Sequence, residues 1–336
     1  MTRLSHTFDI APVDRETVDR IVAGLYEVAA ACRFDGRGWL ITPDEEALSL
    51  LVERAGELGL IDVREREKRI AERERAITEL REGDPSPGRR EELEIQASRL
   101  GLQLRSGRHL EPRTRYLVAE LSPDGIPVEP GDDETKGWSG TGVAVTSWDP
   151  WGRAAIDYAM PDGTGTGEPA VTWGSVAHDG AAGTLDWSLE IRLPGRGARL
   201  RSASGALHID LDAWYATLDG GPVPPVHLSA THAMARVEGW IDATRTPEGR
   251  WSVKAVLDVR GRGLYRPFVA AALWATRASF RRQDARIRRE GTGEPTTADR
   301  LEQAARDWDT AAQAAPQVPD LLADLARVMS EERRRP

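Results

Sequence analysis

The sequence contains almost no cysteine and very little lysine, and each scarcity excludes a class of protein. With one cysteine, Cys32, in 336 residues, neither an intramolecular disulfide nor a cysteine-based zinc cluster can form. The only lysines are Lys68, Lys136 and Lys254, so arginine carries nearly all of the positive charge. The formal net charge is −9, which argues against a chain that coats nucleic acid in bulk.

Long apolar runs are also missing. The longest lies at residues 268–275, far short of the ~20 residues that cross a bilayer. The first residues lead directly into polar sequence and lack the apolar core of a secretory signal. We therefore expect no transmembrane segment and a cytoplasmic location.

The common signatures of catalysis are absent as well. The chain has no Gly-x-Ser-x-Gly, no His-Glu-x-x-His, no Walker loop and no Cys-x-x-Cys pair. Residues 163–167 have the composition of a phosphate-binding loop, but a strand is predicted to follow them, and an anion site of that kind needs a helix N-terminus. We expect no cofactor and no resident metal.

Residues 1–61 predict a β-α-β-α unit. Leu4 to Ile10 alternate as in a strand, and an apolar stripe from Val18 to Cys32 predicts a helix. A second strand is expected over 34–41. A capping box with proline at the first helical position, residues 42–45, then opens a second helix that ends at Gly59.

Residues 62–110 predict a charged helical hairpin. Val63, Ile70 and Ile77 recur every seven residues among arginine and glutamate, and the turn at 83–88 must break the helix. We expect the second helix to run through Leu100 and Leu104. Because few apolar residues line the contact between the two helices, we expect the hairpin to pack against the rest of the protein or against a partner. Segment 62–104 is therefore a candidate oligomer contact.

Residues 111–290 predict the main domain, a tryptophan-rich antiparallel β structure. From about Tyr116 the pattern has a period of two, most clearly over 184–193, and the alternation at 207–214 predicts another strand. Segments 226–245 and 251–259 predict a hairpin around the turn 246–249. We predict an α+β fold whose central antiparallel sheet or barrel is covered by a long C-terminal helix.

A basic amphipathic helix is predicted after Gly263, and it ends near residue 290. It is expected to pack on the sheet, with an outward basic surface at its far end formed by Arg281, Arg282, Arg288 and Arg289. Such a surface permits peripheral contact with an anionic membrane. Residues 291–336 form a tail with two shorter helices, predicted over 297–315 and 319–333.

The order of elements over 116–290 is similar to the helix-grip fold of lipid-transfer and polyketide-cyclase-like proteins. In that family the final helix lies across a curved sheet and roofs an apolar cavity. The resemblance is one of element order, and it assigns no functional residue. A helix-grip-like sheet with insertions is therefore the alternative fold.

The tryptophans of the β region are the first candidate site. The chain has 11 tryptophans, and each offers a large apolar surface with one hydrogen-bond donor, which suits ligand contact as well as a core. The candidates for ligand or partner contact are Trp148, Trp151, Trp214 and Trp240. Trp148 and Trp151 lie in a predicted turn, where core packing explains an aromatic pair less well.

His208, Asp210 and Asp212 form the second candidate site. On a strand their side chains would share one face, with alternate residues ~7 Å apart. An imidazole and two carboxylates can bind a divalent metal or perform acid–base catalysis. The competing interpretation is the solvated face of a half-buried strand, which we favour because no second ligand-bearing segment is evident.

Three functions follow, in order of preference. The first is a non-catalytic binding protein that recognises an apolar small molecule, a lipid or a protein through the tryptophan-rich β domain. The second is an acid–base or metal-assisted enzyme centred on His208, Asp210 and Asp212. The third is a scaffold that recruits a partner through the helical hairpin.

Overall fold

The computed structural model describes residues 2–43, 45–122, 141–159, 170–192, 201–266, 271 and 296–331. The chain divides into two compact units, each built from segments that are distant in the sequence. Unit 1 comprises Met1–Arg15, Asp149–Ala155 and Asp162–Gln313. Unit 2 comprises Glu16–Trp148, Ile156–Pro161 and Ala314–Pro336.

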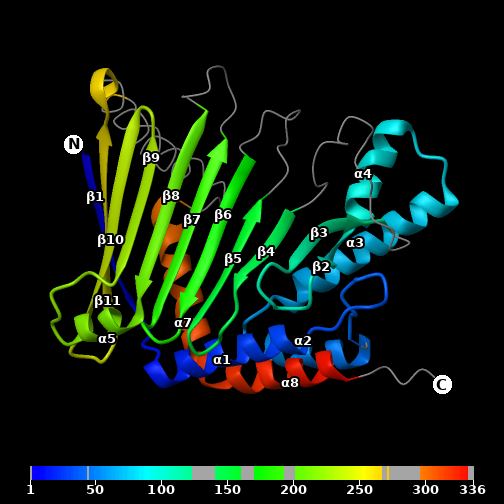
Figure 1. Cartoon of the computed structure of the whole chain (residues 1–336), viewed down its shortest axis with the longest axis horizontal. Coiled ribbons are helices and arrows are strands. Elements are labelled where there is room, and N and C mark those ends of the chain that lie inside the picture. Colours follow the sequence, from blue (N-terminus) through cyan, green and yellow to red (C-terminus); the bar gives the residue numbers. More distant parts are fainter. Residues whose placement is uncertain are drawn as a thin grey trace. The chain divides into compact units, whose positions relative to one another are not determined.

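The strands form an open antiparallel sheet (Figure 1), which confirms the predicted central sheet. They are β1 (Thr2–Ile10), β2 (Arg99–Ser106), β3 (Arg115–Leu121), β4 (Thr141–Ser147), β5 (Arg153–Ala159), β6 (Ala170–Asp179), β7 (Thr184–Arg192), β8 (Ser202–Asp210), β9 (Val226–His232), β10 (Ala235–Arg245) and β11 (Trp251–Gly261). Their order is β1-β11-β10-β9-β8-β7-β6-β5-β4-β3-β2. Because β1 and β2 stand at the two ends of this order, the described strands do not close into the barrel that was the other expectation.

The described helices fall mostly at the two ends of the chain. They are α1 (Arg15–Ala31), α2 (Glu45–Glu57), α3 (Val63–Glu82), α4 (Pro87–Ala97), α5 (Leu211–Leu218), α7 (Thr297–Ala314) and α8 (Val318–Ser330), with short 3-10 turns η3 (Gly263–Tyr265) and η4 (Ala315–Gln317). The last two α-helices match the predicted C-terminal pair. Within the described segments, no helix combines the length and apolar character needed to cross a membrane.

The basic helix predicted between residues 266 and 290 lies almost wholly outside the described residues. The same holds for its proposed surface at Arg281, Arg282, Arg288 and Arg289, and for the glycine-rich run at 163–167.

The β-α-β-α unit predicted over residues 1–61 is corrected in two respects. First, β1 belongs to the large sheet, because it pairs along its whole length with β11, from Thr2 opposite Val259 to Ile10 opposite Trp251. Second, the strand expected over 34–41 is reduced to isolated bridges, because the carboxylate of Asp35 accepts hydrogen bonds from two backbone N–H groups further along and curls the chain. The predicted β-α-β-α unit therefore does not form.

The helical hairpin is confirmed, but its second helix is shorter than expected. Ala76, Leu93 and Ala97 form a small buried cluster between α3 and α4. The helix ends at Ala97, and β2 begins two residues later. Leu100, expected on the helix, lies in this strand because Leu100, Leu102 and Leu104 also satisfy a period of two.

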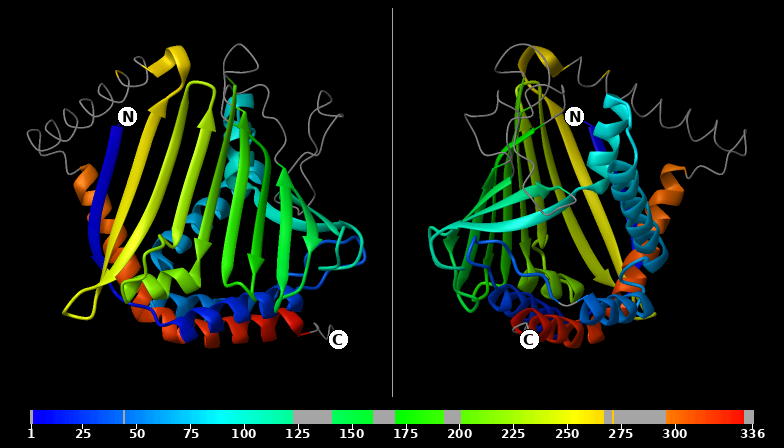
Figure 2. Two further views of the ribbon diagram at one scale, coloured as in Figure 1. Left: turned by 60° about the vertical axis from the view of Figure 1, so that its left-hand side comes forward. Right: turned by 90° about the vertical axis from the view of Figure 1, so that its right-hand side faces the viewer.

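Unit 2 also contains the second C-terminal helix. α8 packs on α2, where a guanidinium nitrogen of Arg54 donates to a carboxylate oxygen of Asp324 at 2.5 Å. α8 also lies close to α1, because a Cβ added at Gly24 would stand 2.9 Å from the Cβ of Leu322. Figures 1 and 2 show the three helices side by side.

In unit 1, two predicted strands change their boundaries. Segment 226–245 is two strands, β9 and β10, and the turn predicted at 246–249 joins β10 to β11, with Gly249 at φ +80°. The strand predicted through Ala213 ends at Asp210. There the Asp210 carboxylate accepts a hydrogen bond from the N–H of Ala213 and caps α5.

The core of unit 1 lies at one end of its sheet. Ile10, Leu218, Ala243, Trp251 and Val253 are buried together, so the cluster draws on β1, β10, β11 and α5. Figure 2 shows α5 at this end of the sheet, between the end of β8 and the start of β9. The indole of Trp251 packs edge-on against the ring of Trp214, with centroids 5.7 Å apart.

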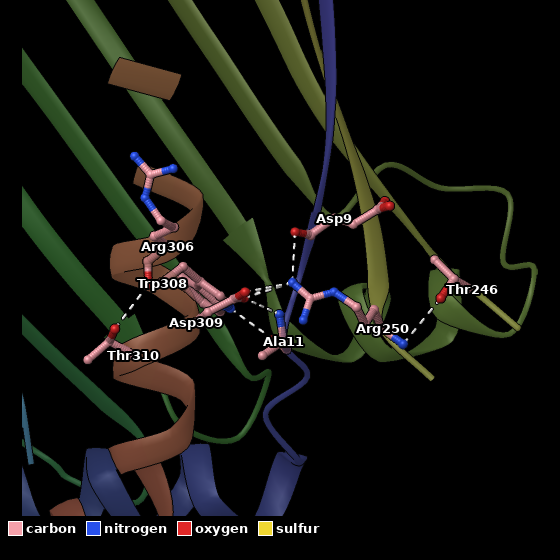
Figure 3. A network of polar contacts seen from close by, with 8 residues as sticks. All are labelled: Asp9, Ala11, Thr246, Arg250, Arg306, Trp308, Asp309 and Thr310. Carbon is pink, nitrogen blue, oxygen red and sulfur yellow. Dashed lines mark hydrogen bonds and ion pairs between the residues drawn. The ribbon is translucent and has the colours of Figure 1, made fainter. Parts of the chain in front are cut away.

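The carboxylate of Asp309 on α7 forms several of the hydrogen bonds between this helix and the edge of the sheet (Figure 3). Asp309 accepts hydrogen bonds from the N–H of Ala11 at 2.6 Å and from Arg250 at 2.7 and 3.0 Å. Arg250 also donates to the carbonyl of Asp9, and the indole of Trp308 donates to the carbonyl of Ala11. Partial burial alone would raise the pKa of Asp309, but these hydrogen bonds outweigh it and hold the pKa below its ordinary value.

We predict that Asp309→Asn lowers the free energy of unfolding by about 2 kcal/mol at neutral pH, because a charge-assisted contact is lost. The folded-state pKa lies below the unfolded value of about 3.9, so this contribution is complete above about pH 4 and is lost as the pH falls through the folded pKa. The difference from wild type therefore shrinks in acid. Urea unfolding followed by circular dichroism measures it.

The matched control is Asp307→Asn, an exposed position on the same helix, which should change stability by less than about 0.5 kcal/mol. Equal losses in the two variants would contradict the anchoring role of Asp309.

Candidate functional site

One continuous register runs through seven neighbouring strands of unit 1. Residues paired directly across antiparallel strands point to the same face of a sheet. One line of directly paired residues on this sheet is apolar, and we call it the apolar row. From β6 through β7, β8, β9, β10 and β11 to β1, it consists of Val176, Trp187, Leu207, Leu228, Gly239, Leu257 and Leu4. A line of hydrocarbon side chains therefore crosses the sheet perpendicular to its strands.

The apolar row lies on the same face as the core cluster but is less well covered. Trp251 and Val253 of the core lie an even number of positions from Leu257 along β11, so all three side chains point to the same face of the sheet. Trp251 and Val253 are each only 3% exposed. In the row, by contrast, Leu4 is 38%, Leu228 37% and Trp187 41% exposed. Helix α5 and the core thus cover one end of this face, whereas the row keeps apolar area accessible to solvent.

The glycine in the row does not interrupt it. A Cβ added at Gly239 would lie 2.6 Å from Cδ2 of Leu257 and 3.5 Å from Cβ of Leu228. The neighbouring leucines therefore occupy the space that a side chain at this position would need. The apolar surface continues from β9 to β11 without a polar break.

The opposite face of the same strands carries mostly polar residues. Asp186, His208 and His227 follow one another directly across β7, β8 and β9. Nδ1 of His208 lies 2.7 Å from a carboxylate oxygen of Asp186, and Nε2 of His227 lies 3.2 Å from a carboxylate oxygen of Glu238. Trp240 is the cross-strand partner of His227. The guanidinium of Arg3 lies over the Trp240 ring, 5.1 Å from the ring centroid.

The structure separates the residues of the predicted His208, Asp210 and Asp212 site. Because the strand ends at Asp210, that carboxylate serves as a helix cap. Asp212 lies on α5 and pairs with Arg15 at 2.5 Å. His208 pairs with Asp186, a residue that sequence spacing gives no reason to connect with it. The three side chains therefore do not form one site, and the described residues hold no group of three or more metal ligands.

The four candidate tryptophans lie in three parts of the chain, with Trp214 on α5, Trp240 on β10, and Trp148 and Trp151 in the connection between β4 and β5. Trp214 packs in the core against Trp251, and Trp240 lies beneath Arg3 on the polar face. Trp148 makes an edge contact with Tyr26, with ring centroids 5.3 Å apart. Trp151, in the turn before β5, is 84% exposed. The tryptophan that belongs to the apolar row is instead Trp187 in β7.

A second polar cluster, in unit 2, has a structural role. His109 is hydrogen-bonded through both ring nitrogens, to the hydroxyl of Tyr116 at 2.7 Å and to the carbonyl of Ala29 at 2.8 Å. The Tyr116 hydroxyl also accepts from the N–H of Leu110, and burial raises the pKa of this phenol. Both imidazole nitrogens are thus engaged in joining a loop to the end of α1.

Comparison with protein-family models, with curated proteins and with solved structures gives no match. The chemistry of the two sheet faces is therefore the basis for a functional conclusion.

Substitutions at two glycines test whether the apolar row is packed as described. Gly239→Ala should lower the free energy of unfolding by about 1–2 kcal/mol, because the new Cβ meets Leu257 and also lies 3.2 Å from the Val256 carbonyl oxygen. Gly205→Ala, on the same face of β8, has no heavy atom nearer than 3.7 Å. It should be neutral or slightly stabilising, since alanine restricts the unfolded chain. Urea unfolding of both variants measures the difference, and equal stability would contradict the close packing at Gly239.

Proposed function

We propose that this protein is a non-catalytic binding protein that receives an apolar hydrocarbon ligand along the apolar row of unit 1. The observation that carries the proposal is the exposure of Leu4, Leu228 and Trp187, each more than a third accessible within one row of apolar residues. Contiguous exposed apolar surface is uncommon on soluble proteins and often marks an interaction site. A ligand that covers these side chains removes their apolar area from water.

The dimensions of the apolar row suit a long hydrocarbon chain. Neighbouring strands lie about 4.8 Å apart, so a row across seven strands is roughly 29 Å long. An acyl chain spans one leaflet, about half of the ~30 Å bilayer core. The row therefore offers more than enough length for one such chain laid across the strands.

The chemistry of the apolar row favours a hydrocarbon over a protein partner. Its strands pair with neighbours on both sides, except for β1 at the edge, so their backbone groups are largely engaged in the sheet. Gly239 has no side chain, and among the six side chains of the row the only polar atom is the indole nitrogen of Trp187. A protein interface typically contains about one hydrogen bond per 100–200 Å². A surface with so few hydrogen-bonding groups matches an aliphatic chain better.

The same arrangement supports binding without catalysis. None of the seven residues in the apolar row has an ionisable side chain, and the His208–Asp186 and His227–Glu238 pairs lie on the opposite face of the sheet. Acid–base catalysis requires a titratable group within hydrogen-bond reach of the reacting atoms. A ligand held along the row is therefore separated by the sheet from these imidazoles and carboxylates.

The test is a titration with a fluorescent 16-carbon fatty acid. Leu228→Asp should weaken binding at least tenfold, about 1.4 kcal/mol, because the ligand would have to cover a carboxylate. Ser229→Asp places the same charge on the neighbouring residue of β9, on the opposite face, and should keep the wild-type affinity. Native mass spectrometry of protein purified from its own host should also show a retained lipid.

Absence of probe binding by the wild-type protein would refute the proposal. So would equal weakening by the two aspartates, because that result would reflect charge in general and not the apolar row. Circular dichroism of both variants checks that the sheet remains folded.

A further inference from the structure

The polar face of unit 1 carries two histidines in a geometry that suits a metal ion. His208 in β8 and His227 in β9 are directly paired, so their Cβ atoms are about 4.5–5.5 Å apart. Their side chains are 46% and 54% exposed. Two imidazoles at this separation on one sheet face are close enough to share one ion and open enough for the ion to enter.

Each imidazole faces a carboxylate on the outer side of the pair. Nδ1 of His208 is hydrogen-bonded to Asp186 in β7 at 2.7 Å, and a carboxylate oxygen of Glu238 in β10 lies 3.2 Å from Nε2 of His227. The two contacts draw the rings in opposite directions, toward β7 and toward β10. The remaining ring edges, with Nε2 of His208 and Nδ1 of His227, are therefore left between β8 and β9.

The hydrogen bond to Asp186 also favours the tautomer of His208 that binds metal. When a neutral imidazole donates one N–H to a carboxylate, the lone pair of its other nitrogen is available. Metal-binding histidines usually have this carboxylate partner, which orients the ring and increases its basicity. Among the described residues, no hydrogen bond is found at Nε2 of His208 or Nδ1 of His227. A proton on Nδ1 of His208 leaves the lone pair of its Nε2 available to an ion, and no described group competes for Nδ1 of His227.

The local charge favours a cation as well. With neutral imidazoles, Asp186 and Glu238 contribute two negative charges, and Arg236, 2.5 Å from Glu238, offsets one of them. Imidazole ligands suit zinc, copper and nickel, whereas magnesium and calcium prefer oxygen. We propose that His208 and His227 form a two-histidine site for a divalent transition metal, with water in the remaining coordination positions.

This site is independent of the proposed hydrocarbon ligand, because it lies on the other face of the sheet. It also differs from the His208, Asp210 and Asp212 cluster suggested by sequence spacing. The aspartates that follow His208 in the sequence are engaged elsewhere, and the second ligand comes from the next strand.

The experiment measures Zn²⁺ binding to the full chain by calorimetry, and Cu²⁺ binding by electron paramagnetic resonance. Wild-type protein should bind one Zn²⁺ per chain, and its Cu²⁺ spectrum should show coupling to two nitrogens. His208→Ala and His227→Ala should each abolish Zn²⁺ binding and reduce the coupling to one nitrogen. Asp186→Asn should retain both ligands but weaken Zn²⁺ binding at least about tenfold, as expected when an orienting carboxylate is lost.

The matched control is His232→Asn, which removes a histidine five positions along from His227 and on the opposite face of β9. It should leave Zn²⁺ binding and the Cu²⁺ spectrum unchanged. The proposal is overturned if wild-type protein binds neither metal, if binding survives in the His208→Ala, His227→Ala double variant, or if His232→Asn weakens binding as much as either alanine. Fatty-acid binding by the same variants should stay at the wild-type level, so failure of one site is distinguishable from failure of the other.

Discussion

The structure of unit 1 depends on one constraint, the residue-for-residue register that runs from β6 through β11 to β1. Side chains alternate between the two faces of a strand, so a slip of one residue in any pair would move its whole apolar set to the polar face. The apolar row from Val176 to Leu4 and the His208–His227 pair both exist only because every register is kept. The buried end of the sheet fixes the register between β1 and β11, because Ile10 and Trp251 are paired with each other and lie in the same core cluster.

Much of this architecture was predictable where the sequence pattern is local. The alternation over 184–193 predicts β7, and the seven-residue spacing of apolar residues predicts α3. The predicted bounds of the two C-terminal helices agree with α7 and α8 to within a few residues. The failures occurred where a single side chain redirects the backbone. Asp210 caps a helix in the middle of an alternating stretch, and Asp35 curls a segment whose composition resembles a strand. Neither hydrogen bond can be read from periodicity.

The candidate sites were harder to predict than the fold because they depend on pairing between strands. Which residue of β9 lies opposite His208 is decided by the turns and the core, and it is not encoded in the spacing of His208 from its neighbours. For the same reason Asp186, which resembles an ordinary solubilising residue, is the hydrogen-bond partner of that histidine. Trp187 lies on the apolar side of an alternating strand, but its exposure depends on which part of that face α5 covers.

The pairing of β1 with β11 also determines when unit 1 can be completed during synthesis. Residues 2–10 leave the ribosome long before their partners at 251–259, because most of the sheet is translated between the two strands. Asp309, which ties down the segment after β1, follows later still. Contacts so distant in sequence make folding slow, and a waiting strand with unpaired backbone groups is prone to associate with other chains. β1 is therefore secured only after β11 and Asp309 have been synthesised, and until then its unpaired backbone groups are open to association with other chains.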